Sequence, residues 1–369
     1  ALGGDRVDVD GEEPDQEGPV KLPAVPPIVA GLCLATVGGL AFWLAGLPAP
    51  WLAGSMVAVT TAALAGMRLS VPGPIRSAVY VLIGIQVGAA FTPQAFESMA
   101  QWPASLLLLA LTVSATTWAG YLFYWKACGW DRASAFFASC PGALSIMLIL
   151  AERERANVPQ VTIVQCTRVF FLVLVLPLVI TGVSEGDGMM LPDEPPAGLP
   201  DVIAMLAAGV GGGAGAGGPR IPAGLVLGPI PAVAFLEIAG LVAGQPPQWF
   251  LVPAYVVLGL LIGARFSGMG LPALRDMLGL GVAGFVLALA VSVAGALAAS
   301  WLTGASPLAA LVAFAPGGLE AMTIMAFALN LEPAFVGTHQ IARYLMLAVA
   351  LPALMVVLRR QWQGERKRR

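Results

Sequence analysis

A motif that occurs twice, with identical internal spacing, constrains this chain more than any other feature of its sequence. The first copy comprises residues 141–147 (PGALSIM) and 165–168 (QCTR), and the second comprises residues 316–322 (PGGLEAM) and 340–343 (QIAR). Each copy places a helix-breaking Pro-Gly pair and an arginine inside apolar sequence, where both are energetically costly. A cost that recurs at fixed spacing indicates that the two stretches build a site.

The repeat extends well beyond this motif. Residues 47–54 match residues 221–228 through a shared Pro-Ala pair and a glycine, and residues 84–91 match residues 259–266 through shared glycines and a final phenylalanine. The two halves of the chain are therefore predicted to be structurally related.

Composition identifies the environment of both halves. Hydrophobic residues make up 58% of the chain, charged residues make up 11%, and the mean hydropathy is +0.84. Soluble domains carry about 25% charged residues. The 44 glycines and 30 prolines suit closely packed, interrupted membrane helices. The chain is therefore predicted to be an all-α polytopic membrane protein.

Apolar segments approach the length needed to cross a bilayer, which is about 20 helical residues. Six lie in each half of the chain. They cover residues 27–47, 51–67, 78–91, 103–125, 133–150 and 159–183 in the first half, and 202–218, 221–243, 249–266, 274–302, 307–329 and 333–358 in the second.

These segments divide the chain into five parts. We predict a disordered acidic tail at residues 1–25, a first membrane repeat at 26–183, an external loop rich in acid and proline at 184–200, a second membrane repeat at 201–358 and a basic cytoplasmic tail at 359–369.

Charge sorting favours two inverted repeats. If the Pro-Gly segments 133–150 and 307–329 re-enter the membrane without crossing it, five crossings remain in each half, and an odd number inverts the second copy. Of the 19 Lys and Arg, all except Arg168 and Arg343 then lie on the cytoplasmic side, together with both termini, and the 184–200 loop carries none. A broken helix that does cross, compensated by another segment that does not, is the alternative.

The two Pro-Gly breaks predict where a solute would bind. Backbone groups released by such a break need partners from protein or water, and transporters place such breaks at the interface of two repeats. A kink packed inside the bundle is the alternative. The candidate solute-binding residues are Pro141, Gly142, Ser145, Gln165, Arg168, Pro316, Gly317, Glu320, Gln340 and Arg343.

Each arginine follows a glutamine by three residues, which places the pair on one helical face. In one interpretation, the guanidinium binds the C-terminal carbonyl groups of the neighbouring broken helix. In the other, it binds an anionic group of the solute. The two roles can coexist.

Three titratable residues are candidates for coupling solute movement to an ion. Glu320 replaces Ser145 in the second copy and could accept a proton, or it could pair with Arg343. His339 is the single histidine, and a lone histidine is often a packing residue. Glu237 is a weaker candidate, because the first half has no counterpart for it.

Several classes of function lack the residues that they need. One histidine and the scattered Cys33, Cys128, Cys140 and Cys166 do not form a metal site, and we expect these cysteines to be small buried side chains. No P-loop or Ser/His/Asp arrangement occurs, and the basic tail is too short for a nucleic-acid footprint. We therefore expect no enzyme activity, cofactor, metal or nucleic-acid partner.

The doubled PG-x-L-x-x-M and Q-x-x-R signature, with a proline-rich loop between the halves, resembles the AbrB-type polytopic membrane proteins, which carry an AbrB duplication. These proteins are unrelated to the small DNA-binding regulator of the same name. The resemblance covers residues 47–177 and 221–352. It implies a multi-pass protein of the bacterial inner membrane, grouped with inverted-repeat carriers of the cation/proton antiporter and anion transporter superfamily.

Members of this family are labelled as regulators of gene expression or as ammonia monooxygenases, and the second label conflicts with the missing metal ligands. We expect a secondary transporter that moves a small anionic solute with H⁺ or Na⁺ coupling. A membrane-embedded ligand sensor that regulates gene expression is the alternative. The expected partners are a small molecule or ion and the lipid bilayer, and the sequence leaves a homo-oligomer open.

Overall fold

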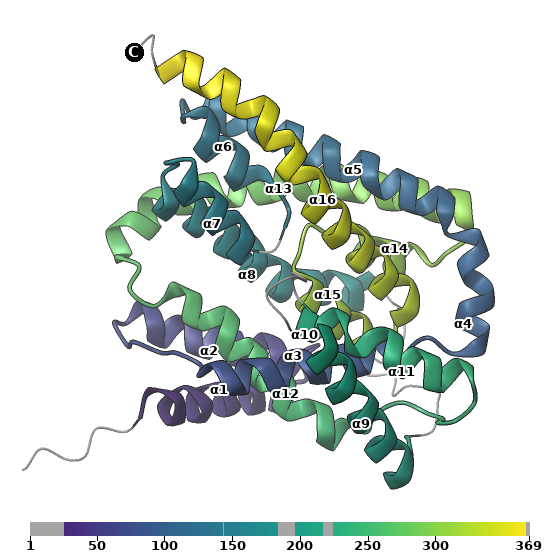
Figure 1. The fold of residues 1–369 in the computed structure, drawn as a ribbon. Helices are drawn as coiled ribbons and strands as arrows, with labels where there is room; N and C mark the ends of the chain where they lie inside the picture. Colours follow the sequence, from purple (N-terminus) through teal and green to yellow (C-terminus); the bar gives the residue numbers. More distant parts are fainter. Residues whose placement is uncertain (1–25, 143, 184–195, 217–223, 367–369) are drawn as a thin grey trace, which may run out of the picture.

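The structure, a computed structural model, describes residues 26–142, 144–183, 196–216 and 224–366 (Figure 1). These ranges are helical, with one isolated bridge between Pro196 and Gln245 and no β-strand among them. The all-α prediction is therefore confirmed. The predicted tail at 1–25 and most of the predicted 184–200 loop lie outside the described residues.

The helices follow one another along the whole described chain. Their bounds are α1 (Pro27–Leu44), α2 (Pro50–Leu64), α3 (Gly73–Ala89), α4 (Pro93–Ser98), α5 (Pro103–Leu122), α6 (Arg132–Ser139), α7 (Leu144–Arg153), α8 (Val158–Val183), α9 (Leu199–Ala216), α10 (Gly224–Leu227), α11 (Pro229–Ile238), α12 (Gln248–Gly263), α13 (Leu271–Thr303), α14 (Pro307–Phe314), α15 (Leu319–Ala328) and α16 (Pro333–Arg366). A 3₁₀ turn at Ala264–Phe266 follows α12, and a π-helical turn at Phe123–Ala127 follows α5.

Proline sets the first residue of many of these helices. Helices α1, α2, α4, α5, α11, α14 and α16 all begin at a proline. The first backbone N–H groups of a helix have no partner within it, so a residue without this N–H costs least there. Part of the high proline content of the chain therefore marks helix starts.

The helices form two bundles that are drawn one above the other in Figure 1. The first bundle, which we call the lower bundle, contains α1, α2, α3, α9, α10, α11 and α12. The second, which we call the upper bundle, contains α5, α6, α7, α8, α13, α14, α15 and α16. Packing of α15 and α16 against α3, and of α8 against α2 and α12, joins the two bundles.

The repeat seen in the sequence recurs in the helix bounds. The shift along the chain that superimposes Pro141 on Pro316 also superimposes both ends of α6 on those of α14, and both ends of α7 on those of α15. It likewise aligns the start of α8 with that of α16, and the start of α3 with that of α12. Helices α3 and α12 occupy the same bundle, as do α8 and α16. Each bundle therefore contains matching helices from both halves of the chain.

Paired glycines let two helices of each half approach closely. A Cβ atom on Gly38 would lie 2.4 Å from the backbone oxygen of Gly54, and one on Gly54 would lie 2.3 Å from that of Gly38. In the second half, the corresponding distances are 2.4 Å for Gly212 and 2.2 Å for Gly228. Such distances exclude any side chain, so the glycine-rich stretch of α9 allows a close helix crossing.

Seven helices in the described residues are long and apolar enough to cross a membrane, and α3 with the segment after it would form an eighth span, bent by 76°. The sequence predicted ten crossings. The difference arises partly because the apolar helices Pro50–Leu64 and Gly224–Ile238 are shorter than a full span. Large apolar side chains such as Trp301 and Val349 are 85% and 76% exposed, as expected for a surface that faces lipid.

Candidate functional site

Both Pro-Gly pairs lie between two short helices. Helix α6 ends at Ser139 and α7 begins at Leu144, whereas α14 ends at Phe314 and α15 begins at Leu319. The last carbonyl groups of α6 and α14, and the first N–H groups of α15, therefore have no partner inside their own helices. The surrounding side chains must therefore supply hydrogen-bond partners for these backbone groups.

Gln340 and Arg343 of α16 bind the carbonyl groups where α14 ends. Gln340 Nε2 donates to the backbone oxygens of Val312 at 3.0 Å and Ala313 at 3.2 Å. The Arg343 guanidinium donates to the backbone oxygens of Ala315 and Gly317 and to Gln340 Oε1. The positive charge thus lies at the partly negative C-terminus of α14, where it is stabilising.

The first half repeats this arrangement. Gln165 Nε2 donates to the backbone oxygens of Phe137 at 2.7 Å and Cys140 at 3.0 Å. Arg168 donates to Gln165 Oε1 and, at 3.5 Å, to the Cys140 oxygen. Both arginines are buried, at 5% exposure for Arg168 and 4% for Arg343. Each therefore makes the carbonyl contacts of the first interpretation given above.

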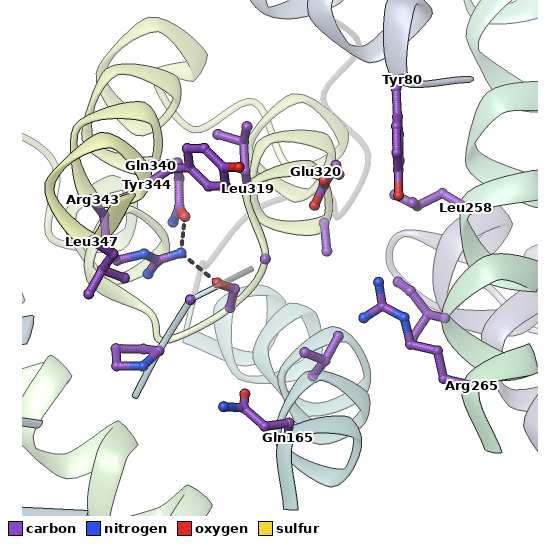
Figure 2. A pocket seen from close by; sticks show the side chains of 17 residues that line it. Tyr80, Gln165, Leu258, Arg265, Leu319, Glu320, Gln340, Arg343, Tyr344 and Leu347 are labelled. Atoms are coloured by element: carbon purple, nitrogen blue, oxygen red, sulfur yellow. Dashed lines mark hydrogen bonds between the residues drawn. The ribbon is translucent and has the colours of Figure 1, made fainter. Parts of the chain in front are cut away.

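A cavity of about 80 Å³ lies between the two bundles, beside both breaks (Figure 2). The upper bundle contributes both Pro-Gly regions and residues of α8 and α16, and the lower bundle contributes residues of α3 and of α12 with the turn that follows it. The lining residues are Tyr80, Pro141, Gly142, Gln165, Val169, Leu258, Ile262, Arg265, Gly317, Gly318, Leu319, Glu320, Ala321, Gln340, Arg343, Tyr344 and Leu347.

Charge of both signs reaches this cavity. Arg265 and Glu320 are partly exposed, and among the described residues neither makes a hydrogen bond or an ion pair. Figure 2 shows both side chains extending into the space between the bundles, and the hydroxyl group of Tyr80 points into the same space. The first turn of α15 adds the partial positive charge of a helix N-terminus.

The structure brings most of the sequence-predicted binding residues together. Pro141, Gly142, Gln165, Gly317, Glu320, Gln340 and Arg343 all line the cavity. Arg168 and Pro316 are not among its lining residues, and the Ser145 side chain lies outside the described atoms. Arg168 lies one helical turn beyond Gln165 and directs its donors to Gln165 and Cys140.

Two of the three coupling candidates lie away from the cavity. His339 contacts Phe335, whose ring centroid is 4.0 Å away, and its Nε2 lies 2.9 Å from Ser105 Oγ. Glu237 is buried near the C-terminus of α11 in the lower bundle. Neither residue lines the cavity, so of the three candidates only Glu320 does.

The sequence interpretation missed three polar residues of the cavity: Tyr80, Arg265 and Tyr344. Arg265 carried a detectable signal, because its repeat counterpart is Ala90 and it thus breaks the repeat. Tyr80 carried no such signal, because its repeat counterpart Tyr255 is also a tyrosine. Tyr255 accepts a hydrogen bond from Gln86 inside the lower bundle. Only the packing of α3 against α15 and α16 places Tyr80 at the cavity.

A second cavity, of about 350 Å³, lies at the other end of α15. Its lining residues come from the segment between α3 and α5, from the loop before α12, and from the end of α15 and the start of α16. They are Ala90, Thr92, Ala95, Ser98, Trp102, Gln245, Phe327, Asn330, Glu332, Pro333, Ala334 and Phe335. The first cavity contacts the start of α15, through residues 318–321, and the second contacts its end. One helix, packed against α3, therefore separates two cavities between the bundles.

The described residues contain no group of three or more His, Cys, Asp or Glu side chains that could hold a metal ion. The four cysteines are free. Cys140 and Cys166 are buried as expected, but Cys33 is exposed and Cys128 is intermediate. Cys33 was wrongly expected to be buried because an apolar helix exposes small side chains to lipid as readily as it buries them.

The fold defines a polytopic α-helical membrane protein in which two related halves line one cavity. The chain belongs to the family described as "Transition state regulatory protein AbrB", which matches residues 51–359.

Two relatives of known name cover almost the whole chain. It is similar to the Escherichia coli (strain K12) protein named "Putative regulator AbrB", with 26% identity over 330 residues, 88% of this chain and 94% of that protein. It is also similar to the Bacillus subtilis (strain 168) protein YhjN, with 24% identity over 362 residues, 91% of this chain and 94% of YhjN.

Proposed function

We propose that this protein is a secondary transporter of the bacterial inner membrane that moves a small solute with an anionic group, driven by an H⁺ or Na⁺ gradient and without chemical conversion of the solute. The observation that carries this proposal is the cavity beside both Pro-Gly breaks, between two bundles that each contain helices from both halves. Sites built from two repeats in this way are typical of membrane carriers.

The preference for an anionic group follows from the donors at the cavity. Arg265 supplies a guanidinium without a partner in the described residues, and the start of α15 supplies backbone N–H groups that no residue of that helix accepts. Arg343 adds a second positive charge, although its hydrogen bonds to Ala315 and Gly317 use part of its capacity. A carboxylate or a similar anion offers the acceptors that these donors need.

Movement across the membrane is supported by the second cavity. Because the two cavities contact opposite ends of α15, a solute in the first would reach the second if α15 moved relative to α3. An α-helix of ten residues is about 15 Å long, so the displacement needed is a fraction of the membrane thickness. We propose that the two halves are inverted, as the charge distribution favours, so that the bundles open alternately to the two sides.

A ligand sensor is the second candidate function. The name of the Escherichia coli relative contains the word regulator. A sensor would use the same cavity to bind its ligand, and the ligand would change the packing of the bundles without crossing the membrane. The distinction between a sensor and a transporter is therefore flux, because both would bind.

Flux through purified protein tests the proposal. The full chain would be screened by thermal shift against small carboxylates, inorganic anions and amino acids, and a stabilising compound would be supplied, radiolabelled, to proteoliposomes. We expect accumulation that depends on an imposed H⁺ or Na⁺ gradient and disappears with the matching ionophore. Binding without accumulation under either gradient would contradict transport and favour the sensor.

Substitutions test whether the solute passes through this cavity. Arg343→Lys keeps the positive charge but loses the planar fork that reaches two carbonyl groups, and we expect it to slow flux about tenfold or more. The control is Arg275→Gln, which removes an exposed arginine of α13. A folded Arg343→Lys protein with unchanged flux would show that solute does not pass this cavity.

A further inference from the structure

Arg265 and Glu320 contribute opposite charges to one cavity from different bundles. Arg265 lies in the 3₁₀ turn that follows α12, and Glu320 is the second residue of α15. Both line the cavity, and neither forms a salt bridge with an opposite charge among the described residues. They therefore lie at the same cavity without forming an ion pair (Figure 2).

The sequence repeat singles out the same two residues. When the two copies are aligned on their Pro-Gly pairs, Arg265 corresponds to Ala90 and Glu320 corresponds to Ser145. The glutamines and arginines that bind the helix ends are instead the same in both halves. At the positions that line the cavity, the second half therefore adds one base and one acid that the first half lacks.

A ligand that pairs with both charges at once suits this cavity better than a ligand that pairs with one. A ligand with only an anionic group would pair with Arg265 and leave the Glu320 carboxylate with a like charge beside it. A ligand with only a cationic group would do the reverse. Because a charge that loses water without gaining a partner is costly, a ligand that matches only one of the two charges binds less tightly than a ligand that matches both.

Glu320 has a simpler role to consider. An acidic side chain in the first turn of a helix offsets its partial positive charge, which is about half an elementary charge. Since the carboxylate carries a full negative charge, this role leaves about half of it without compensation. The remaining negative charge is available to a cationic group of the ligand.

The size of the cavity limits the ligand. A volume of about 80 Å³ compares with roughly 10–15 Å³ for one water molecule on the same measure, so about five to eight non-hydrogen atoms fit. This excludes a peptide, a nucleotide or a sugar phosphate from the space as it stands. It accommodates a small amino acid.

We propose that the ligand is a small zwitterion, with a carboxylate that binds Arg265 and an ammonium group that binds Glu320. This inference rests on the proposed function for the transport of the ligand, but the binding itself applies equally to a sensor. Tyr80, whose hydroxyl group points into the same space, is placed to donate to the carboxylate. The remaining alternatives are an anion bound together with a separate Na⁺ or proton at Glu320, and a direct Arg265–Glu320 ion pair that closes the empty cavity.

Three compounds of nearly equal size separate these alternatives. L-Alanine carries both charges, propionate lacks the ammonium group, and ethylamine lacks the carboxylate. Equilibrium binding of each, and of glycine, L-serine and β-alanine, would be measured on the full purified chain in lipid nanodiscs, with and without Na⁺ and at two pH values. We expect at least one zwitterion of this set to bind about tenfold or more tightly than propionate and ethylamine under every condition.

Variants assign the two charges. Glu320→Gln and Arg265→Gln remove one charge each with little change of volume, and we expect each to weaken binding of the zwitterion about tenfold or more. Glu320→Gln should at the same time reduce the preference for L-alanine over propionate, because only the ammonium group loses its partner. The matched controls are Asp276→Asn and Arg275→Gln, which change exposed residues of α13 and should leave binding unaltered.

Specific outcomes would overturn the inference. One is failure of every zwitterion in the set to bind at millimolar concentration. Another is propionate binding that is as tight as zwitterion binding, or tighter. If that binding required Na⁺ or low pH, the cation beside Glu320 would be a separate Na⁺ or proton. Equal losses of thermal stability in both charge variants, with binding unchanged, would identify a closing ion pair.

The proposed function and this inference fail in different experiments. Zwitterion binding without gradient-driven accumulation in proteoliposomes would contradict transport and leave the ligand class standing. Accumulation of an anion without an ammonium group would contradict the ligand class and leave transport standing.

Discussion

Arg343 donates a hydrogen bond to the backbone oxygen of Ala315, the residue at which α14 gives way to the Pro-Gly break. In the first half, Arg168 reaches the equivalent oxygen of Cys140 only at 3.5 Å. Arg343 also binds Gly317 on the far side of the break and lines the cavity, whereas Arg168 does neither in the described residues. The arginine of the signature therefore has a structural role in both halves but lines the cavity only in the second.

This difference predicts unequal effects of the same substitution. Lysine keeps the charge but is a single point donor, so Arg343→Lys should lose one of two carbonyl contacts across the break and cost about 1–3 kcal/mol of stability. Arg168→Lys should cost less, because its carbonyl contact is already long. Thermal unfolding in detergent, followed by tryptophan fluorescence, measures both, and an equal or larger loss in Arg168→Lys would contradict the assignment.

The close approach of α9 to the start of α11 predicts opposite effects at neighbouring glycines. Gly212→Ala places a methyl group 2.4 Å from the Gly228 oxygen and should cost about 1–3 kcal/mol through overpacking. Gly211→Ala meets no atom within 4 Å and should be neutral or stabilise by up to about 1 kcal/mol through helix propensity. Thermal unfolding of the two variants and of the parent protein measures these differences in stability. Similar values for both would mean that the crossing is looser than the structure indicates.

The turn after α7 predicts a stabilising substitution. Arg155 has a φ of 55°, and its counterpart Asn330 in the second half has a φ of 51°. The same backbone hydrogen bond closes the end of the helix in both turns. The Ala156 N–H donates to the Ala151 oxygen in the first half, and the Leu331 N–H donates to the Ala326 oxygen in the second.

Asparagine adopts this left-handed conformation at lower cost than arginine, so Arg155→Asn should stabilise the protein by about 0.5–1 kcal/mol. Arg153→Asn, at an exposed helical position of the same segment, is the matched control and should not stabilise. The midpoint of thermal unfolding measures the gain, and a loss of stability in Arg155→Asn would contradict the turn geometry.

The elements that could be predicted from the sequence are those set by local chemistry. Apolar length located the long helices, Pro-Gly pairs located the ends of α6 and α14, and the high glycine content indicated close helix packing. The short helix α4, which follows α3 after a bend of 76°, was missed because its six residues lack the apolar length of a span.

Elements that depend on packing between distant segments could not be predicted. Charge sorting placed Arg265, near the end of the predicted segment 249–266, on the cytoplasmic side. Its contact with the cavity depends on how the lower bundle packs against the upper one. Likewise, nothing local to His339 indicates that its partner is Ser105, 234 residues away.

His339 provides the last prediction. Its Nδ1 donates to the Phe335 oxygen at 2.8 Å, Nε2 lies 2.9 Å from Ser105 Oγ, and the residue is fully buried away from the cavity. Both ring nitrogens are therefore occupied by packing contacts, so His339 should not couple solute movement to protons. We expect Ser105→Ala and His339→Gln to lower stability by about 1–3 kcal/mol and to leave the pH dependence of flux in proteoliposomes unchanged. A pH profile that flattens in His339→Gln but not in Ser105→Ala would instead assign a proton-coupling role to the imidazole, because only that variant removes a titratable group.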